Sequence, residues 1–238
     1  NSGGARDALL AALDLPHPKA RRAVVTALGS FVDGTVAETL AARLAAGDAS
    51  YLVEGELAHS LGRTRQPAAL GALRAAIDRP SWNETIRVGV FDGLAALQDP
   101  RAIELVAPGL ARHQDILVRC AAARCLTSFY SAPEQAMRAL EPWLGDSAFR
   151  LQLTLAAHLE QLADHRALKA LQRLVAHTAN GRVRRRGREA VRRLSELLGA
   201  GRATHDLRTE LDDLRQSHRD LRDRMDRHLQ RSAAPDEG

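Results

Sequence analysis

Hydrophobic residues along this chain recur with a period of about 33 positions. The clearest members are apolar anchors that stand just before a turn, separated by steps of 33, 33, 32, 33 and 32 residues. These anchors are Leu28, Leu61, Leu94, Leu126, Leu159 and Val191. Mostly apolar residues also stand four and eight positions before each anchor, and such spacings lie on one face of a helix. The pattern therefore predicts a series of related helices, each ending near its anchor.

A turn and a second apolar stripe follow each of the first five anchors. Five residues after the anchors come Asp33, Gln66, Asp99, Ser131 and Asp164. Proline follows closely in three of these turns, and proline suits the first turn of a new helix. Leu, Ile, Val and Met then recur at helical spacing. Each unit is therefore predicted to be a helix, a short turn and a second helix.

A single helix pair of this kind cannot bury its apolar face, but stacking against its neighbours can. The tetratricopeptide anchors are missing, as is the ankyrin T-P-L-H motif, so a short HEAT-like repeat fits best. The residue before an anchor is small in five units, as close helix contact requires; the exception is His158. We predict an all-α fold: a right-handed α-solenoid of HEAT-like helix pairs, with a C-terminal heptad helix.

The repeat phase also predicts the domain organisation. Residues 1–15 are a linker and an N-terminal capping helix, and residues 16–199 are the solenoid, with five full repeats and a half repeat. Residues 204–231 change to a heptad seam with charged flanks, and residues 232–238 form a disordered tail. The seam positions are Leu207, Leu211, Leu214, His218, Leu221, Met225 and His228. This helix either self-associates or folds back as a cap on the solenoid.

Composition agrees with a core of close-packed helices. Hydrophobic residues make up 45% of the chain and aromatic residues 3%, so Ala, Leu and Val must fill the core. Cys120 and Cys125 are five residues apart, which places them about 140° apart around a helix. They therefore form neither a disulfide nor a metal pair, which favours a reducing compartment, and we expect a cytoplasmic protein.

No apolar run approaches the roughly 18 residues that a membrane-spanning helix needs, and no signal peptide is recognisable, so we expect no membrane partner. The chain begins with Asn1 and not with Met. We therefore expect it to be part of a longer protein, with a linker at its start.

The formal net charge is +5, and only Lys19 and Lys169 are lysines among the 34 basic residues. Arginines concentrate between residues 181 and 193, where a candidate basic patch contains Arg184, Arg185, Arg188 and Arg192. Two interpretations stay open: a solvated outer face of the terminal repeat, or a phosphate-binding surface. No aromatic residue stands among these arginines to stack on bases, which favours the solvated face over nucleic acid.

Motifs for catalysis, metal or cofactor binding are missing. The chain contains no H-E-x-x-H, C-x-x-C, P-loop, G-x-S-x-G or dinucleotide-binding motif. His158 and His165 are seven residues apart, but no Asp or Cys completes a ligand set beside them. We expect this chain to have no catalytic residue, no metal ligand and no cofactor.

The string SWNE contains a rare tryptophan at a predicted helix start. Ser81 and Glu84 match the S-x-x-E capping box, in which the serine hydroxyl accepts the Glu84 amide and the carboxylate accepts the Ser81 amide. Trp82 would then cover the end of the preceding helix, over Ile77 and Pro80. This interpretation makes the tryptophan a plug between two repeats.

Two strings, DASYLVEGELAHSLGRTR and SWNETIRVGVFDGLAALQDPRA, carry a family resemblance. They resemble the C-terminal HEAT-like domain of bacterial zinc aminopeptidases of the aminopeptidase N-like (gluzincin) family. The S-Y and S-W-N-E elements are the distinctive part, and the match is closest over residues 48–102. In that family the zinc and the catalytic motifs belong to an upstream domain, and none of them occurs here.

The resemblance implies a non-catalytic domain that packs on an upstream catalytic domain and shapes access of peptide substrates. It makes Tyr51, Trp82 and Asn83 candidate contacts on a concave or inter-domain surface. Two alternatives stay open. One is a free-standing HEAT-repeat scaffold for protein interactions, and the other is a nucleic-acid-binding HEAT-like protein that uses the arginine-rich face.

Overall fold

The structure is a computed structural model that describes the backbone of residues 2–232. It describes the side chains of residues 3–200 and, beyond them, those of residues 211, 214–216, 218, 219 and 222. The chain forms two compact units, Asn1–Leu194 and Ser195–Gly238. Residues 2–232 contain helices and connecting turns and no strand. The predicted tail lies, from residue 233 onward, outside the described residues, as do most side chains of the predicted heptad seam.

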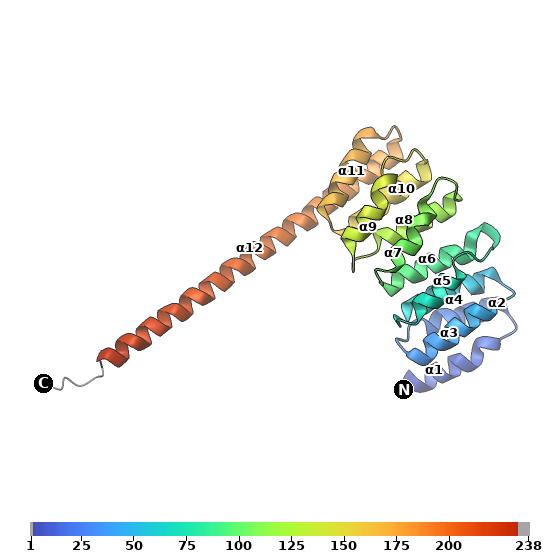
Figure 1. Cartoon of the computed structure of the whole chain (residues 1–238), viewed down its shortest axis with the longest axis horizontal. Helices are drawn as coiled ribbons and strands as arrows, with labels where there is room; N and C mark the ends of the chain where they lie inside the picture. Colours follow the sequence, from blue (N-terminus) through green and yellow to red (C-terminus); the bar gives the residue numbers. More distant parts are fainter. Residues whose placement is uncertain (1, 233–238) are drawn as a thin grey trace. The chain divides into compact units, whose positions relative to one another are not determined.

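Helices of the first unit stack in chain order as pairs (Figure 1). The first helices of the pairs are α2 (Pro18–Leu28), α4 (Tyr51–Arg63), α6 (Thr85–Leu97), α8 (Ile116–Thr127) and α10 (Phe149–His158). The second helices are α3 (Gly34–Ala46), α5 (Ala69–Ala76), α7 (Ala102–Val106), α9 (Pro133–Leu140) and α11 (His165–His177). Before them stands α1 (Ser2–Ala11), and after them α12 (Gly181–Ser232), which belongs to both units.

Short 3-10 helices extend several of these elements. They are η1 (Ala12–Asp14), η2 (Trp82–Glu84), η3 (Ala107–Leu110), η4 (Glu141–Trp143) and η5 (Leu159–Leu162). Predicted turn residues act as helix caps: Asp33 accepts a hydrogen bond from the Val36 amide at 3.0 Å, and Asp164 accepts one from the Arg166 amide at 2.5 Å. The predicted all-α fold, an α-solenoid of helix pairs, is confirmed.

The core follows the predicted anchors through the first five repeats. All five of these leucines have 0% of their surface exposed. The prediction of Val191 as the sixth anchor is wrong. Val191 is half-buried, whereas Ala190 and Leu194 on α12 are buried. Leu198, which we placed on the same apolar face, is half-buried as well. The half repeat has no second helix of its own to cover this side, so the buried face of α12 shifts by one residue.

Glycines bring α4 and α6 into backbone contact. A Cβ atom at Gly62 would overlap the carbonyl oxygen of Gly93, and one at Gly89 would overlap the carbonyl oxygen of Gly55. A Cβ atom at Gly93 would in turn overlap the carbonyl oxygen of Ala58. Gly93 is the small residue before the anchor Leu94, and it serves the purpose predicted for it, because any side chain here would push two backbones apart.

A second regularity is a ladder of polar side chains along the first helices. Seven residues before each predicted anchor stand Arg21, Glu54, Arg87, Arg119, Gln152 and Arg184. We call these six residues the polar ladder. Each is bonded to a loop between two repeats, so the ladder links every helix pair to its neighbour.

Arg119 shows the arrangement most completely. Its Nε donates to the carbonyl oxygen of Leu110 in the preceding loop at 2.8 Å, and its Nη2 donates to Asp146 in the following loop at 2.8 Å. The guanidinium also lies 5.6 Å from the ring centroid of Trp143, a cation–π distance. Asp146 in turn accepts the Ala148 amide at 2.9 Å, which orients the chain as it enters α10.

Other residues of the polar ladder have the same geometry with different partners. Arg21 donates to both carboxylate oxygens of Asp48 at 2.8 Å, and Asp48 accepts the Ser50 amide before α4. At Glu54 the charges are exchanged, because its carboxylate accepts from Arg79 at 2.5 Å. Gln152 accepts from the Thr178 hydroxyl at 3.1 Å. The position therefore requires a long polar side chain and not one particular charge.

We expect Gly89→Ala to lower the free energy of unfolding by about 2–3 kcal/mol, because the new methyl group must separate α4 from α6. Gly71→Ala is the matched control: Gly71 lies in α5, is exposed, and has open space around it. That substitution should be neutral or add up to about 1 kcal/mol through helix propensity. Urea denaturation measures both, and equal effects would contradict the backbone contact.

We expect Asp146→Asn to cost about 3 kcal/mol at neutral pH, because the Arg119 and Asp146 side chains are only 7% and 5% exposed and the guanidinium would lose its counter-charge. Burial raises the pKa of Asp146, but bonds from Arg119 and the Ala148 amide outweigh it and hold the pKa below the usual 3.8. A depressed pKa gives stability that is present above about pH 4 and is lost as pH falls through the lower folded-state value.

The gap between wild type and Asp146→Asn should therefore shrink as the pH is lowered from about 5 to about 2, as read from urea midpoints. Glu134→Gln is the control, because the Glu134 pair with Arg138 is exposed and should change stability by no more than about 0.5 kcal/mol. A gap that stays constant with pH would show that the Asp146 charge is not what stabilises the loop.

Candidate functional site

Large apolar side chains are exposed where the first helices of the pairs begin. Trp82 is 71% exposed, Leu52 56% and Tyr51 49%. We call this row the apolar edge; its members are Leu15, Tyr51, Leu52, Trp82, Leu117 and Phe149. Because α4 and α6 touch through their backbones and η2 contacts both α6 and α8, neighbouring members come from adjacent elements. Exposed apolar groups gathered in this way are typical of protein-interaction surfaces.

The Trp82 segment has an unusual backbone. Asn83 and Glu84 have φ angles of 50° and 55°, in the left-handed region that most residues with a side chain avoid. The Ser81 hydroxyl accepts a hydrogen bond from the Ile86 amide at 3.0 Å, and the Ser81 carbonyl accepts the Glu84 amide at 3.2 Å. Strain of this kind persists only where surrounding contacts hold it.

The predicted capping box of Ser81 and Glu84 is therefore wrong in its partners. Two successive left-handed residues carry the chain past the ordinary helix start, so the serine hydroxyl meets the Ile86 amide instead of the Glu84 amide. The Glu84 carboxylate lies 3.5 Å from Nε of Arg87. Ser81 is still a cap, but with a longer reach than the S-x-x-E pattern predicts.

The predicted role of Trp82 as a plug between repeats is also wrong. A plug would lose most of its contact with solvent, whereas most of the Trp82 surface is exposed. The joint between these repeats is closed by the glycine contacts of α4 and α6, which leave no space for an indole ring. Tyr51, Trp82 and the exposed Asn83 are thus available at the surface, and the structure places them on one edge.

The candidate basic patch is divided by the structure. Arg184 is half-buried and donates to the Thr178 carbonyl at 2.7 Å, as the last rung of the polar ladder. Arg185 donates to Glu189 at 3.2 Å. Arg188 and Arg192 are exposed and have no ion pair with a described residue. Two of the four cations are therefore engaged within the fold, and two face solvent.

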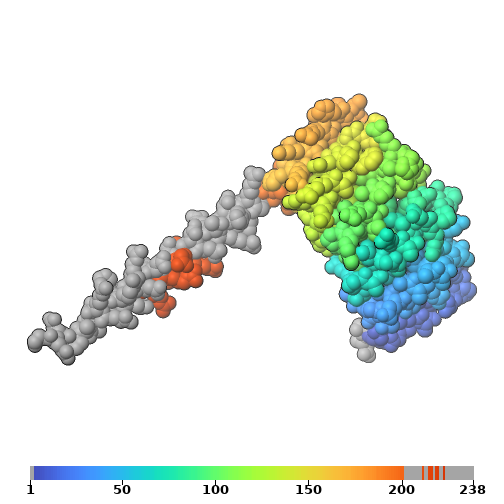
Figure 2. Space-filling model, in the orientation of Figure 1, coloured from blue at the N-terminus to red at the C-terminus, as the bar shows by residue number. Residues whose placement is uncertain are grey.

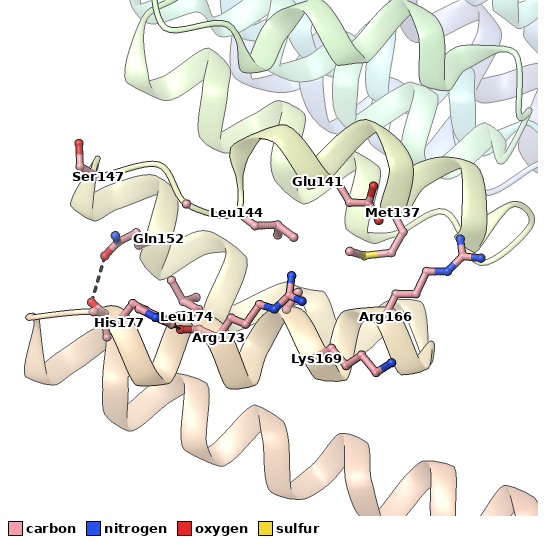
Figure 3. Close-up of a pocket in the computed structure, with 13 residues that line it drawn as sticks. Met137, Glu141, Leu144, Ser147, Gln152, Arg166, Lys169, Arg173, Leu174 and His177 are labelled. Carbon is pink, nitrogen blue, oxygen red and sulfur yellow. Dashed lines mark hydrogen bonds between the residues drawn. The ribbon is translucent and has the colours of Figure 1, made fainter.

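A groove that the sequence did not predict opens between α11 and the segment formed by α9 and η4 (Figure 3). Its volume is about 910 Å³. One wall carries Arg166, Lys169, Arg173 and His177 from α11, and the other includes Met137, Glu141 and Leu144. We call it the basic groove. The available signal was the spacing of the four α11 residues by three, four and four positions, which places them on one helix face.

Hydrogen bonds hold the side chains at the His177 end of the basic groove in place. Nδ1 of His177 lies 2.8 Å from the carbonyl oxygen of Arg173, and since a carbonyl only accepts, Nδ1 carries the proton. Nε2 of a neutral His177 is then an acceptor. Thr178 and Gln152 are bonded to each other at 3.1 Å and belong to the groove lining. The α11 wall is thus fixed to the neighbouring repeat by the polar ladder.

No group of three or more His, Cys, Asp or Glu residues that could hold a metal ion occurs among the described residues. His158 is half-buried, and burial, followed by the charges of Arg124 and Arg186, lowers its pKa. Burial strongly raises the pKa of the Cys125 thiol, so this group stays protonated. None of the described helices is both long and apolar enough to cross a membrane.

Comparison with known proteins identifies the repeats. The family model described as HEAT repeats matches residues 6–87 and 103–192. One similar solved structure is the complex of CpcE and CpcF of phycocyanin lyase from Nostoc sp., at 24% identity and a TM-score of 0.47, covering 83% of this chain and 82% of that one. Another is human deoxyhypusine hydroxylase in complex with glycerol, at 18% identity and a TM-score of 0.42, covering 83% of this chain and 85% of that one. No curated protein matches the chain.

Proposed function

Because this chain belongs to the HEAT repeat family, we propose that it is a non-catalytic scaffold that holds a partner protein against its apolar edge. The observation that carries the proposal is the exposure of Trp82, Leu52 and Tyr51 on adjacent elements. Trp and Tyr are enriched among the residues that dominate binding energy at protein interfaces.

Rigid presentation of these side chains supports the proposal. Ser81 ties the Trp82 turn to α6 through the Ile86 amide, and glycine contacts hold α4 against α6. A partner therefore meets Tyr51 and Trp82 at a nearly fixed spacing. Ordering them on binding costs less conformational entropy than ordering flexible loops would.

A finer form of the proposal names the partner. The resemblance of residues 48–102 to the C-terminal domain of zinc aminopeptidases makes the partner a zinc-containing catalytic domain in the same polypeptide. The apolar edge residues Tyr51, Leu52 and Trp82 fall inside that segment. This finer form rests on the sequence resemblance alone.

We expect the chain by itself to hydrolyse no aminoacyl-anilide substrate in the presence of added zinc. Its sequence has no H-E-x-x-H pair to bind the metal and no glutamate positioned beside such a pair as general base. Absorbance of the released aniline provides the measurement. Turnover that copurifies with the chain and is lost on adding a chelator would contradict the non-catalytic assignment.

We expect Trp82→Ala to weaken binding to the polypeptide encoded directly upstream by at least about tenfold, since a buried tryptophan contributes on the order of 2 kcal/mol or more at an interface. Titration calorimetry with the two purified proteins measures the dissociation constants. Val32→Ala is the matched control, because Val32 is equally exposed but lies in the turn between α2 and α3.

The control should bind like wild type, and both variants should keep the wild-type melting temperature. Equal loss in the two variants would contradict docking on the apolar edge. If the upstream polypeptide binds but contains no H-E-x-x-H motif, the aminopeptidase form of the proposal is wrong and the scaffold form is supported.

A further inference from the structure

We propose that the basic groove is a second binding site, which takes an extended acidic segment of a partner protein. It lies within the first unit, between α11 and the α9–η4 segment, and Figure 3 shows the side chains of both walls pointing across it. The site is separate from the apolar edge and shares no residue with it. Loss of either site therefore leaves the other to be tested independently.

Charge is the first argument. Arg166, Lys169 and Arg173 line the groove from α11, whereas Glu141 is the carboxylate of the opposite wall. Figure 3 shows Arg166 and Arg173 extending toward that wall. Glu134 lies 3.9 Å from Arg166, but neither Lys169 nor Arg173 has an ion-pair partner among the described residues. The groove thus has an excess of positive charge that nothing in the described fold neutralises. An anionic ligand would neutralise this charge.

A second groove of the same protein has a different balance of charge. A smaller groove of about 310 Å³ lies between α5 and the α7–η3 segment, two repeats earlier. Its cations Arg74 and Arg87 share the lining with Asp78 and Glu104, and Arg87 is already bonded to the Ile77 carbonyl at 2.9 Å. The charges that line this smaller groove are therefore balanced, and the basic groove differs from it in this respect.

Spacing indicates the shape of the ligand. Arg166 and Arg173 are seven residues apart, which is about 10 Å along a helix. Three residues of a polyproline II segment span nearly the same distance, at about 3.1 Å each, and its three residues per turn bring side chains i and i+3 to the same side. Acidic residues at positions i and i+3 of such an extended segment would therefore face these two arginines, with Lys169 between them.

The groove floor is apolar. Met137 and Leu174 are buried beneath it and Leu144 is half-buried beside it. Met adapts its shape to different apolar groups. A segment with one apolar side chain between its two acids would place that side chain against this floor, which distinguishes it from a purely electrostatic ligand.

A peptide fits this lining better than a nucleic acid does. No lining residue is Phe, Tyr or Trp, so the large rings on which bases stack are missing from the groove. Glu141 and Nε2 of a neutral His177 are acceptors, and a peptide supplies backbone N–H donors for them. A phosphodiester backbone supplies no such donors.

The test uses the whole chain and a fluorescein-labelled peptide of sequence GGELGEGG, measured by fluorescence anisotropy. We expect saturable binding that weakens with added salt, and at least tenfold weaker binding for the double variant Lys169→Glu/Arg173→Glu. The matched control is Arg188→Glu/Arg192→Glu, which makes the same charge change at two exposed arginines outside the groove. That variant should lose less than about twofold, since its charges are exposed, lie outside the groove lining and are screened by salt.

Two further arms separate charge from packing. The exchange Lys169→Arg/Arg173→Lys should keep affinity within about threefold, because the positive charges stay in place. Replacing the peptide leucine by glycine should weaken binding by about tenfold, since one buried leucine contributes roughly 1.5 kcal/mol. All variants should melt at the wild-type temperature.

Several results would overturn the proposal. One is absence of saturable binding up to about 1 mM peptide, the weak limit of specific recognition. Another is equal loss in the groove variant and the control variant, which would mean nonspecific attraction. A third is tighter binding of a single-stranded oligothymidine than of the peptide through the same two residues, which would assign the groove to nucleic acid.

Discussion

Hydrogen bonds between the polar ladder and the segments that join the repeats are the contacts on which this solenoid depends. Arg119 illustrates why, because it satisfies the Leu110 carbonyl behind it and the Asp146 carboxylate ahead of it. A loop at a joint between repeats carries carbonyl groups that no helix satisfies, and leaving them buried without a partner is costly. The polar ladder solves this at each joint and sets the register of adjacent pairs.

The geometry of both candidate surfaces depends on these joints between repeats. The loop that holds Asp146 also contributes Gly145 and Ser147 to the basic groove, and the Thr178 rung closes its other end. Trp82 stands in the loop that precedes α6, where Arg87 of the ladder holds the Ile77 carbonyl. Residues of both candidate surfaces therefore lie beside residues that connect the repeats, whereas Trp82 and Lys169 are not themselves members of the polar ladder.

Particular residues show where reasoning from the sequence succeeded and failed. The anchors Leu28 to Leu159 were predicted correctly because burial of a helical face leaves a periodic signature. The capping box at Ser81 failed because left-handed residues at Asn83 and Glu84 changed which amide the hydroxyl meets. Trp82 was misplaced because the sequence does not show that the turn before α6 leaves most of its surface exposed. The basic groove was missed because its two walls are about 30 residues apart in the chain, and local periodicity says nothing about the gap between them.

The sequence by itself determined the helix pairs, their period and the small residues at their contacts, because helix periodicity and turn chemistry are local properties. The polar ladder has the same period, but the sequence does not show which groups its side chains bind. Only the tertiary structure decided which polar groups meet, which cations stay unpaired and which apolar groups remain exposed. These depend on how closely α4 approaches α6 and how far α11 stands from α9, and such distances come from packing between segments that are remote in the chain.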